Sequence, residues 1–242
     1  MKIGYIVSCY LGARRVENSA YTSDRFFYLK KQLDQLNSIS HSLNEIIFVF
    51  NLREEDYPLL HEAVDLVSKH PTSKTHNTTI MTRANSGFSY GAWDFALKEI
   101  GGKFDYCLLI EDDFVAYVND FDKKFLSYFG EENIFFVCQL YSNVIIGKKH
   151  CAISNGMINN KIFNDYYKKN KVGFDLKLDD DYSAAEHNQV CFMDKFIEKG
   201  SLVKDITDKY YVPYVNFKKI LVDYGQKDAE ALIVPIWPPF FT

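Results

Sequence analysis

The order of apolar and polar positions predicts strands alternating with helices in the first half of the chain. Residues 3–10, 45–50 and 106–110 are short apolar runs that end in polar residues, as buried strands do, and residues 78–82 form a weaker run. Apolar residues at helical spacing occupy the three intervening segments, residues 26–36, 58–67 and 90–100. This order predicts a mostly parallel sheet with right-handed crossovers, flanked by helices.

The second half of the chain is less regular. We expect the following elements there: helices at residues 121–129, 161–169 and 183–199, a strand at 134–139, and a strand pair from 144–146 and 151–153. In the last of these helices, Val190, Met193 and Ile197 are expected to face inward. Residues 171–182 are polar and predict a loop, and the tail at 231–242, which contains three prolines, predicts extended chain.

Composition and charge narrow the class of protein. Of the 242 residues, 47% are hydrophobic and 25% are charged, which is an ordinary globular balance. The net charge of −4 gives no basic footprint, so we expect no nucleic-acid partner. The five cysteines contain no C-x-x-C pair and lie mostly in apolar runs, which favours buried thiols in a reducing compartment. The first apolar run is too short for a signal peptide and no run suits a transmembrane segment, so we expect a cytoplasmic protein.

The candidate chemistry lies where the strands end, because ligands bind at the carboxyl ends of strands in an open parallel sheet. The run at 106–110 leads directly into Glu111, Asp112 and Asp113, and apolar residues follow again. Three adjacent carboxylates next to a buried strand repel one another, and a divalent cation such as Mg²⁺ or Mn²⁺ removes that conflict. The alternative is a solvated turn that caps the next segment.

A second motif precedes the third helix, at Asn85, Ser86 and Gly87. Gly87 permits a positive φ or a close backbone approach, and amides at the start of the following helix are suited to a phosphate. Asn-Ser-Gly is also ordinary turn chemistry, so a simple turn and helix cap is the alternative.

The two motifs together carry a family resemblance. Residues 108–113 resemble the D-x-D motif of nucleotide-sugar glycosyltransferases of the GT-A fold, some of which have Glu-Asp-Asp there, and residues 85–94 resemble their N-x-G segment. The resemblance implies an α/β, GT-A-like (Rossmann-like) fold, with a mostly parallel central sheet flanked by helices. It implies a single domain over residues 1–242, with the nucleotide-sugar-binding half at 1–115 and the acceptor-binding half and tail at 116–242.

The resemblance also implies a reaction. It is the metal-dependent transfer of a sugar from a nucleotide-diphosphate sugar to a glycan or another hydroxyl acceptor, with Mn²⁺ or Mg²⁺ held by Asp113 and Glu111. The residues that it places at the nucleotide-sugar are Ser8, Tyr10, Asn51, Glu54, Arg83, Asn85, Gly87, Asp94, Glu111 and Asp112. Asn51 stands where many members have Asp, so UDP, GDP, CMP and dTDP all stay open as the nucleotide. For each polar contact the alternative is an ordinary loop residue.

Inverting transfer requires a base that takes the proton of the acceptor hydroxyl. In inverting relatives an acidic residue at the start of a late helix has this role, and Glu186 resembles it. Ser183 and Glu186 also form the S-x-x-E pattern of a capping box, in which the Glu only holds the helix start. The acidic run at 179–181 is a nearby rival.

Two other functions fit parts of the same pattern. A metal-dependent phosphoester hydrolase or nucleotidyltransferase uses a similar sheet, but the pyrophosphorylase group has a Gly-rich basic loop after its first strand, and residues 11–15 hold a single glycine. A non-catalytic nucleotide- or carbohydrate-binding module would bind the donor without turnover, and loss of Glu186 would then change nothing.

Overall fold

The computed structural model of the chain describes residues 1–11, 24–130, 133–138, 141–142, 150–151, 155–179, 182–206 and 233–235. The strands are β1 (Ile3–Tyr10), β2 (Glu45–Leu52), β3 (Thr78–Ala84), β4 (Tyr106–Glu111), β5 (Phe114–Ala116), β6 (Ile134–Cys138), β7 (Tyr141–Ser142), β8 (His150–Cys151), β9 (Gly156–Asn159), β10 (Leu202–Asp205) and β11 (Ile233–Pro235). The helices are α1 (Phe27–Ser38), α2 (Tyr57–Lys69), α3 (Pro71–Thr75), α4 (Phe88–Ile100), α5 (Phe121–Leu126), α6 (Asn160–Asn170), α7 (Tyr182–Cys191) and α8 (Asp194–Ile197), with a 3₁₀ turn, η2 (Glu54–Asp56).

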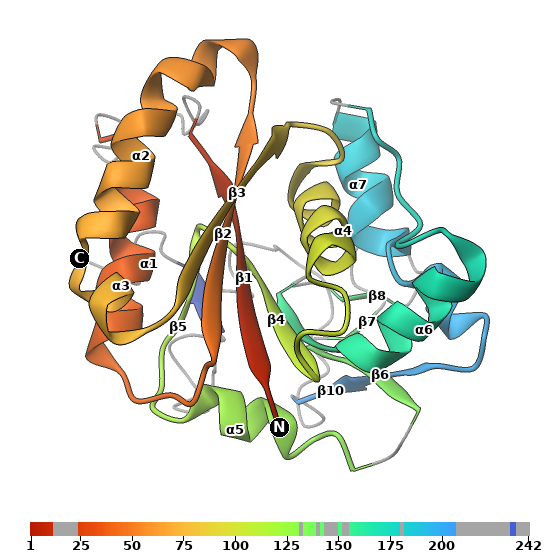
Figure 1. Cartoon of the computed structure of the whole chain (residues 1–242). Helices are drawn as coiled ribbons and strands as arrows, with labels where there is room; N and C mark the ends of the chain where they lie inside the picture. The colour runs from red at the N-terminus through yellow and green to blue at the C-terminus, as the bar shows by residue number, and fades with distance from the viewer. Residues whose placement is uncertain are drawn as a thin grey trace.

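The central sheet has seven strands in the order β10-β6-β9-β4-β1-β2-β3 (Figure 1). Neighbouring strands are parallel except β9, which is antiparallel to both β4 and β6. The strand order reverses at β1, because β2 and β3 lie on one side of it and β4 lies on the other. Such a switch point opens a crevice at the carboxyl ends of the strands. The predicted α/β class with a mostly parallel sheet is confirmed.

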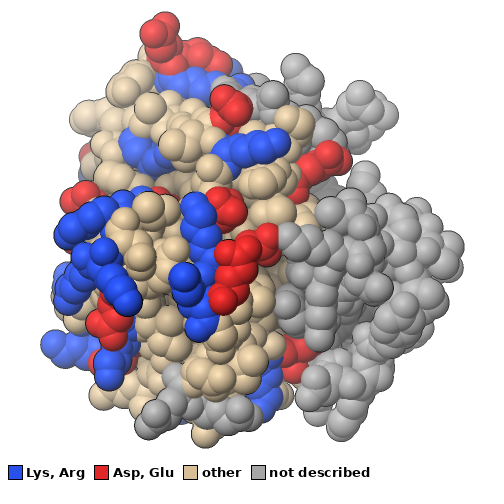
Figure 2. Space-filling view, turned by 90° about the vertical axis from the view of Figure 1, so that its right-hand side faces the viewer, with Lys and Arg blue, Asp and Glu red and all other residues tan. Residues whose placement is uncertain are grey.

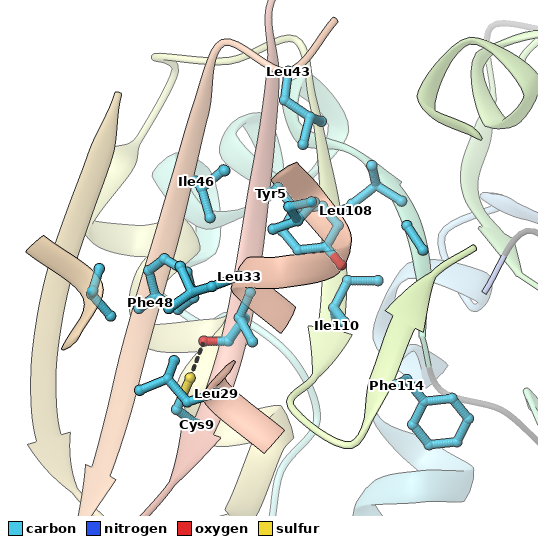
Figure 3. Packing of buried hydrophobic residues seen from close by; sticks show 14 of the residues in the cluster. Tyr5, Cys9, Leu29, Leu33, Leu43, Ile46, Phe48, Leu108, Ile110 and Phe114 are labelled. Carbon is cyan, nitrogen blue, oxygen red and sulfur yellow. Dashed lines mark hydrogen bonds between the residues drawn. The ribbon is translucent and has the colours of Figure 1, made fainter. Parts of the chain in front are cut away.

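Helices cover both faces of this sheet. One core cluster packs α1 and α2 against alternate residues of the strands, such as Tyr5 and Phe48 (Figure 3). The other cluster packs α4 and α6 against the residues between them, such as Ile6 and Val49. Since successive side chains of a strand point to opposite faces, a central strand covered on both faces is mostly apolar, and β1 and β2 are buried over almost their whole length.

The predicted helix at 183–199 is wrong as one element, because it is broken into α7 and α8. The Phe192 carbonyl accepts the Asp175 N–H (3.1 Å), and the Phe196 N–H turns instead to the Met193 carbonyl (3.0 Å). The break brings both phenyl rings into the core. It also leaves Ile197 exposed, where an inward side chain was expected.

Several short elements were not predicted. They include β9, β10 and a two-stranded sheet of β5 with β11, which places part of the predicted tail beside the end of β4. Cys151 pairs through β8 with β7, whereas residues 144–146, its predicted partner, lie outside the described residues. The predicted helix at 121–129 ends at Leu126. All five cysteines are free, and four of them are buried, as expected.

The described part of the surface is mixed in charge. Figure 2 shows the side of the molecule with α6 and α7, where basic and acidic side chains lie next to one another on the described residues. No helix among the described residues has the length and apolar character needed to cross a membrane.

Candidate functional site

The face of the sheet that packs against α4 becomes polar at the carboxyl edge. In each of the first four strands, the residue that follows the buried apolar positions on this face is polar: Ser8, Asn51, Arg83 and Glu111. The strand register aligns Ser8 with Glu111, and Asn51 with Arg83. The period of two that builds the core therefore also places these polar side chains on one face, beside the start of α4.

Three of these side chains form a connected row. The Asn51 amide nitrogen donates to the Ser8 hydroxyl (2.9 Å), and Arg83 Nη1 donates to the Asn51 amide oxygen (2.6 Å). Ser8 and Asn51 are buried. Burial lowers the pKa of the Arg83 guanidinium, and the Asp94 carboxylate opposes that shift. The row therefore places the positive charge of Arg83 at the carboxyl edge of the sheet.

The acidic triplet occupies the turn from β4 into β5. The Asp112 N–H donates to the Ser8 carbonyl (3.1 Å), and its buried carboxylate accepts the Tyr10 N–H (3.0 Å). Asp112 therefore extends the pairing of β1 with β4 beyond the last ladder position. Glu111 and Asp113, on either side of it, are partly exposed.

Two buried amide side chains support this turn, and the sequence reasoning missed both. Gln32 of α1 points its amide nitrogen at the carbonyls of Glu111 (3.3 Å), Asp112 and Phe114. Asn155 accepts the Glu111 N–H (2.5 Å) through its amide oxygen. A signal for Gln32 was present, because it lies within the apolar stripe of its helix, between Leu29 and Leu33.

The N-x-G turn leads into α4 with an unusual backbone. Gly87 has φ +69° and Phe88 has φ +55°, so two successive residues are left-handed. The φ of Gly87 confirms the predicted glycine with positive φ. The left-handed conformation of Phe88 costs about 1–2 kcal/mol, because Phe88 has a side chain. Gly91 lies one turn later, and a Cβ there would collide with the Ser86 carbonyl oxygen and lie 3.0 Å from Arg83 Nη2. The turn, the guanidinium and the first turn of α4 are thus in close contact.

The remaining residues predicted to contact the nucleotide-sugar lie around this edge, and each has different neighbours. Tyr10 ends β1, and its ring lies 5.5 Å from the Arg53 guanidinium, which the prediction did not include. Glu54 is exposed on η2. Asn85 donates its backbone N–H to the Leu52 carbonyl (2.9 Å). The Asp94 carboxylate pairs with Lys98 (2.5 Å) and accepts the Phe174 N–H (2.9 Å), so it joins α4 to the segment before α7.

Glu186 lies on α7, which packs beside α4, and it is exposed. Because α7 begins at Tyr182, Ser183 is inside the helix and is not its N-cap, so the predicted capping box does not describe this helix start. Among the described residues, no hydrogen bond or ion pair links Glu186 to the acidic triplet. Its role as a base stays a prediction, and so do the ligand contacts of the edge residues.

The comparisons with known proteins show the fold. The sequence matches no protein-family model and no curated protein. The structure is similar to mannosyltransferase PcManGT from Pyrobaculum calidifontis, solved with GDP-Man and Mn²⁺, at a TM-score of 0.54 and 12% identity, over 93% of this chain and 61% of that one. This chain therefore spans less than two thirds of that protein.

Two further solved structures resemble this chain less closely. A cytidylyltransferase from Leptospira borgpetersenii has a TM-score of 0.49 and 10% identity, over 88% of this chain and 79% of that one. The 4-diphosphocytidyl-2C-methyl-D-erythritol synthase from Anaerococcus prevotii also has a TM-score of 0.49, with 14% identity, over 93% and 96%. The fold of this chain is GT-A-like.

Proposed function

We propose that this chain is a metal-dependent glycosyltransferase, which moves a sugar from a nucleotide-diphosphate sugar to a hydroxyl acceptor. The observation that carries the proposal is the acidic turn at the switch point between β1 and β4. There the carboxylates of Glu111 and Asp113 are partly exposed, next to the polar row that ends at Arg83. The mannosyltransferase with the similar fold was solved with GDP-Man and Mn²⁺, which supports the same class of donor and metal here.

The donor set fits a hard cation that takes few protein ligands. Asp112 is buried and bonded to the Tyr10 backbone, which leaves Glu111 and Asp113 as the more exposed carboxylates. Among the described residues, no group of three or more His, Cys, Asp or Glu side chains is arranged to hold a metal. Mg²⁺ commonly binds through one or two carboxylates together with substrate phosphates. Glu111 and Asp113 would hold the ion, and when bound it supplies positive charge at the leaving diphosphate.

The residues of the chain itself supply the other functions. The Arg83 guanidinium and the start of α4 bring positive charge to the edge where the diphosphate would lie. Gln32 and Asn155 hold the backbone of the acidic turn from both sides, so its carboxylates keep their direction. Glu186 takes the proton of the acceptor hydroxyl, which makes the transfer inverting.

The test is a turnover assay with Mn²⁺ and a panel of UDP-, GDP-, CMP- and dTDP-sugars. We expect release of the nucleoside phosphate from one donor, faster with a hydroxyl acceptor such as an oligosaccharide. Glu186→Gln should lower turnover by about 10²- to 10⁴-fold and keep donor binding, while Glu198→Gln, at another exposed position, should keep both. Pyrophosphate release from a nucleoside triphosphate and a sugar 1-phosphate, without transfer from any nucleotide-sugar, would make the nucleotidyltransferase reading correct and this proposal wrong.

A further inference from the structure

A buried asparagine joins α7 to the start of α4. Asn188 is fully buried on α7, and its amide nitrogen donates to the Lys177 carbonyl (2.8 Å) and the Gly87 carbonyl (3.4 Å). Its amide oxygen accepts the Lys177 N–H (2.7 Å). One side chain therefore bonds both to the left-handed residue that caps α4 and to the segment that leads toward α7.

That segment, residues 173–178, is fixed to α4 at further points. The Phe174 N–H donates to the Asp94 carboxylate (2.9 Å), and the Ser86 hydroxyl donates to the Leu178 carbonyl (2.8 Å). A Cβ on Gly173 would collide with the Asp94 carboxylate, so the segment lies directly on the helix. The contacts cross between the predicted donor half and the predicted acceptor half of the chain.

Asn188 and Glu186 occupy opposite sides of α7. Two residues along a helix differ in direction by about 200°, since each turn holds about 3.6 residues. Asn188 has no exposed surface, and Glu186 is exposed. The bonds of Asn188 therefore fix the inner side of α7, and the rigid helix transmits that position to the carboxylate on its outer side.

We propose that Asn188 is a positioning residue, which sets the place of Glu186 relative to the start of α4 and so to the bound donor. This inference rests on the proposed function. Asn188 touches neither donor nor acceptor in it, and acts only through Glu186, with its bonds to Gly87 and Lys177 as the anchor of α7. Its loss should lower kcat much more than it changes KM for the donor, because misplacing a reacting group by about 1 Å can cost about 100-fold in rate.

The chain offers a matched control at the other end of α4. Asn160 is also fully buried, and its amide nitrogen also donates to two backbone carbonyls, those of Gly101 (2.8 Å) and Phe104 (2.9 Å). In both residues, a change to Asp replaces this donor by an oxygen that faces two carbonyls. Asn188→Asp and Asn160→Asp should therefore lower Tm alike, and only the former should lower kcat.

The deciding experiment is a double-mutant cycle with Glu186→Gln, measured at saturating donor, acceptor and Mn²⁺. We expect Asn188→Asp to lower kcat by about 10- to 100-fold in the wild type and to have no further effect in the Glu186→Gln background, since a residue that acts only through another is non-additive with it. Asn160→Asp should leave kcat within about twofold of its parent in both backgrounds. The Ala variants of both asparagines replace the Asp variants if these do not fold.

Each other outcome overturns the inference in a recognisable way. Equal loss of kcat in both backgrounds, or equal loss in the Asn160 variant, assigns Asn188 a purely structural role. Loss of donor binding in Asn188→Asp, measured by calorimetry, assigns it to the donor site itself. Failure of the proposed function appears instead in the wild type, as no donor binding and no turnover, and that result removes this inference with its premise.

Discussion

The two edges of the central sheet use polar side chains in different ways. At the amino edge, three side chains accept backbone N–H groups: Asn44 that of Ile3 (2.7 Å), Asp105 that of Lys2 (2.6 Å), and Asp122 that of Ser42 (2.7 Å). The buried Glu45 carboxylate at the same edge accepts the Thr79 hydroxyl (2.6 Å) and pairs with Lys103 (2.6 Å). At the carboxyl edge, Asn51 bonds to another side chain, Ser8, and receives a third, Arg83. Asp112, Gln32 and Asn155 bond to the backbone at the carboxyl edge as well, so the distinguishing feature of this edge is the row that includes the Arg83 guanidinium.

Under the proposed function, the amino edge holds loops and the carboxyl edge faces a ligand. A side-chain oxygen that accepts a backbone N–H stabilises a chain terminus or a turn, and Asp and Asn can both do this. A buried amide and hydroxyl in a row with a cation cost desolvation and fix the direction of each member. The carboxyl edge adds the partly exposed carboxylates of Glu111 and Asp113.

The largest expected difference between the edges comes from removing one carboxylate at each. Asp113→Asn should weaken Mn²⁺-dependent binding of the cognate nucleotide by about tenfold or more, because an interaction with a charged group contributes about 1.5–3 kcal/mol. Asp105→Asn, at the amino edge, should leave that affinity unchanged. Calorimetric titration of both variants with nucleotide, with and without Mn²⁺, checks this. Equal affinities for Asp113→Asn and the wild type would remove the functional distinction between the edges.

Glycines near the two ends of α4 allow a second comparison, because a Cβ would collide with its neighbours at one of them and not at the other. Gly91→Ala would normally favour a helix, but here its Cβ collides with the Ser86 carbonyl oxygen, so we expect a loss of about 1–3 kcal/mol in the free energy of unfolding. At the other end of the helix, a Cβ on Gly102 meets its nearest atom at 3.8 Å. Gly102→Ala should stay within about 0.5 kcal/mol of the wild type in urea unfolding. A neutral Gly91→Ala would mean that the Ser86 turn is not held against α4.

The smallest expected effect concerns the pH dependence of the amino edge. Burial lowers the pKa of His41 from 6.5, and the neighbouring His76 ring, 4.4 Å away, lowers it further, while Asp122 opposes the shift. The unfolded chain then binds a proton on His41 at a higher pH than the folded protein does. This residue's contribution to stability is therefore full above pH 6.5 and is lost as the pH falls through 6.5 toward the lower folded value.

His41→Gln should flatten the fall of Tm between pH 7 and the acid limb of the curve, whereas His61→Gln, at an exposed position of α2, should not. Thermal unfolding at a series of pH values measures both. A wild-type curve that stays level through the titration of His41 would show that its ring is not desolvated at this edge.

Much of the fold could be predicted because β1, β2 and β4 are mostly apolar runs, which indicate a sheet covered on both faces. The antiparallel strand β9 could not be predicted, since its four residues show no hydrophobic periodicity. Its formation depends on pairing with β4 and β6. The break between α7 and α8 also depends on tertiary contact, because Asp175, from another segment, bonds to the Phe192 carbonyl.

The candidate site likewise contains residues that the sequence predicts and residues that only the fold reveals. Glu111 and Asp113 were visible because charges next to a buried strand conflict with their surroundings. Asn188 carries no comparable signal, since one asparagine in a helix does not reveal that Gly87, 101 residues earlier, is its partner. Local chemistry can be read from the chain order, whereas the bonds that hold distant segments together need the fold.

The proposed function depends on the claim that the carboxyl edge binds a nucleotide through a divalent cation. Its most direct test is the Tm of the wild-type protein with UDP, GDP, CMP or dTDP, each with and without Mn²⁺, because a ligand that binds only the folded state must raise the Tm. We predict a rise with one of these nucleotides that requires Mn²⁺ and is smaller in Asp113→Asn. No rise with any nucleotide in either condition would contradict the claim and would leave Glu111, Asp112 and Asp113 as a structural turn.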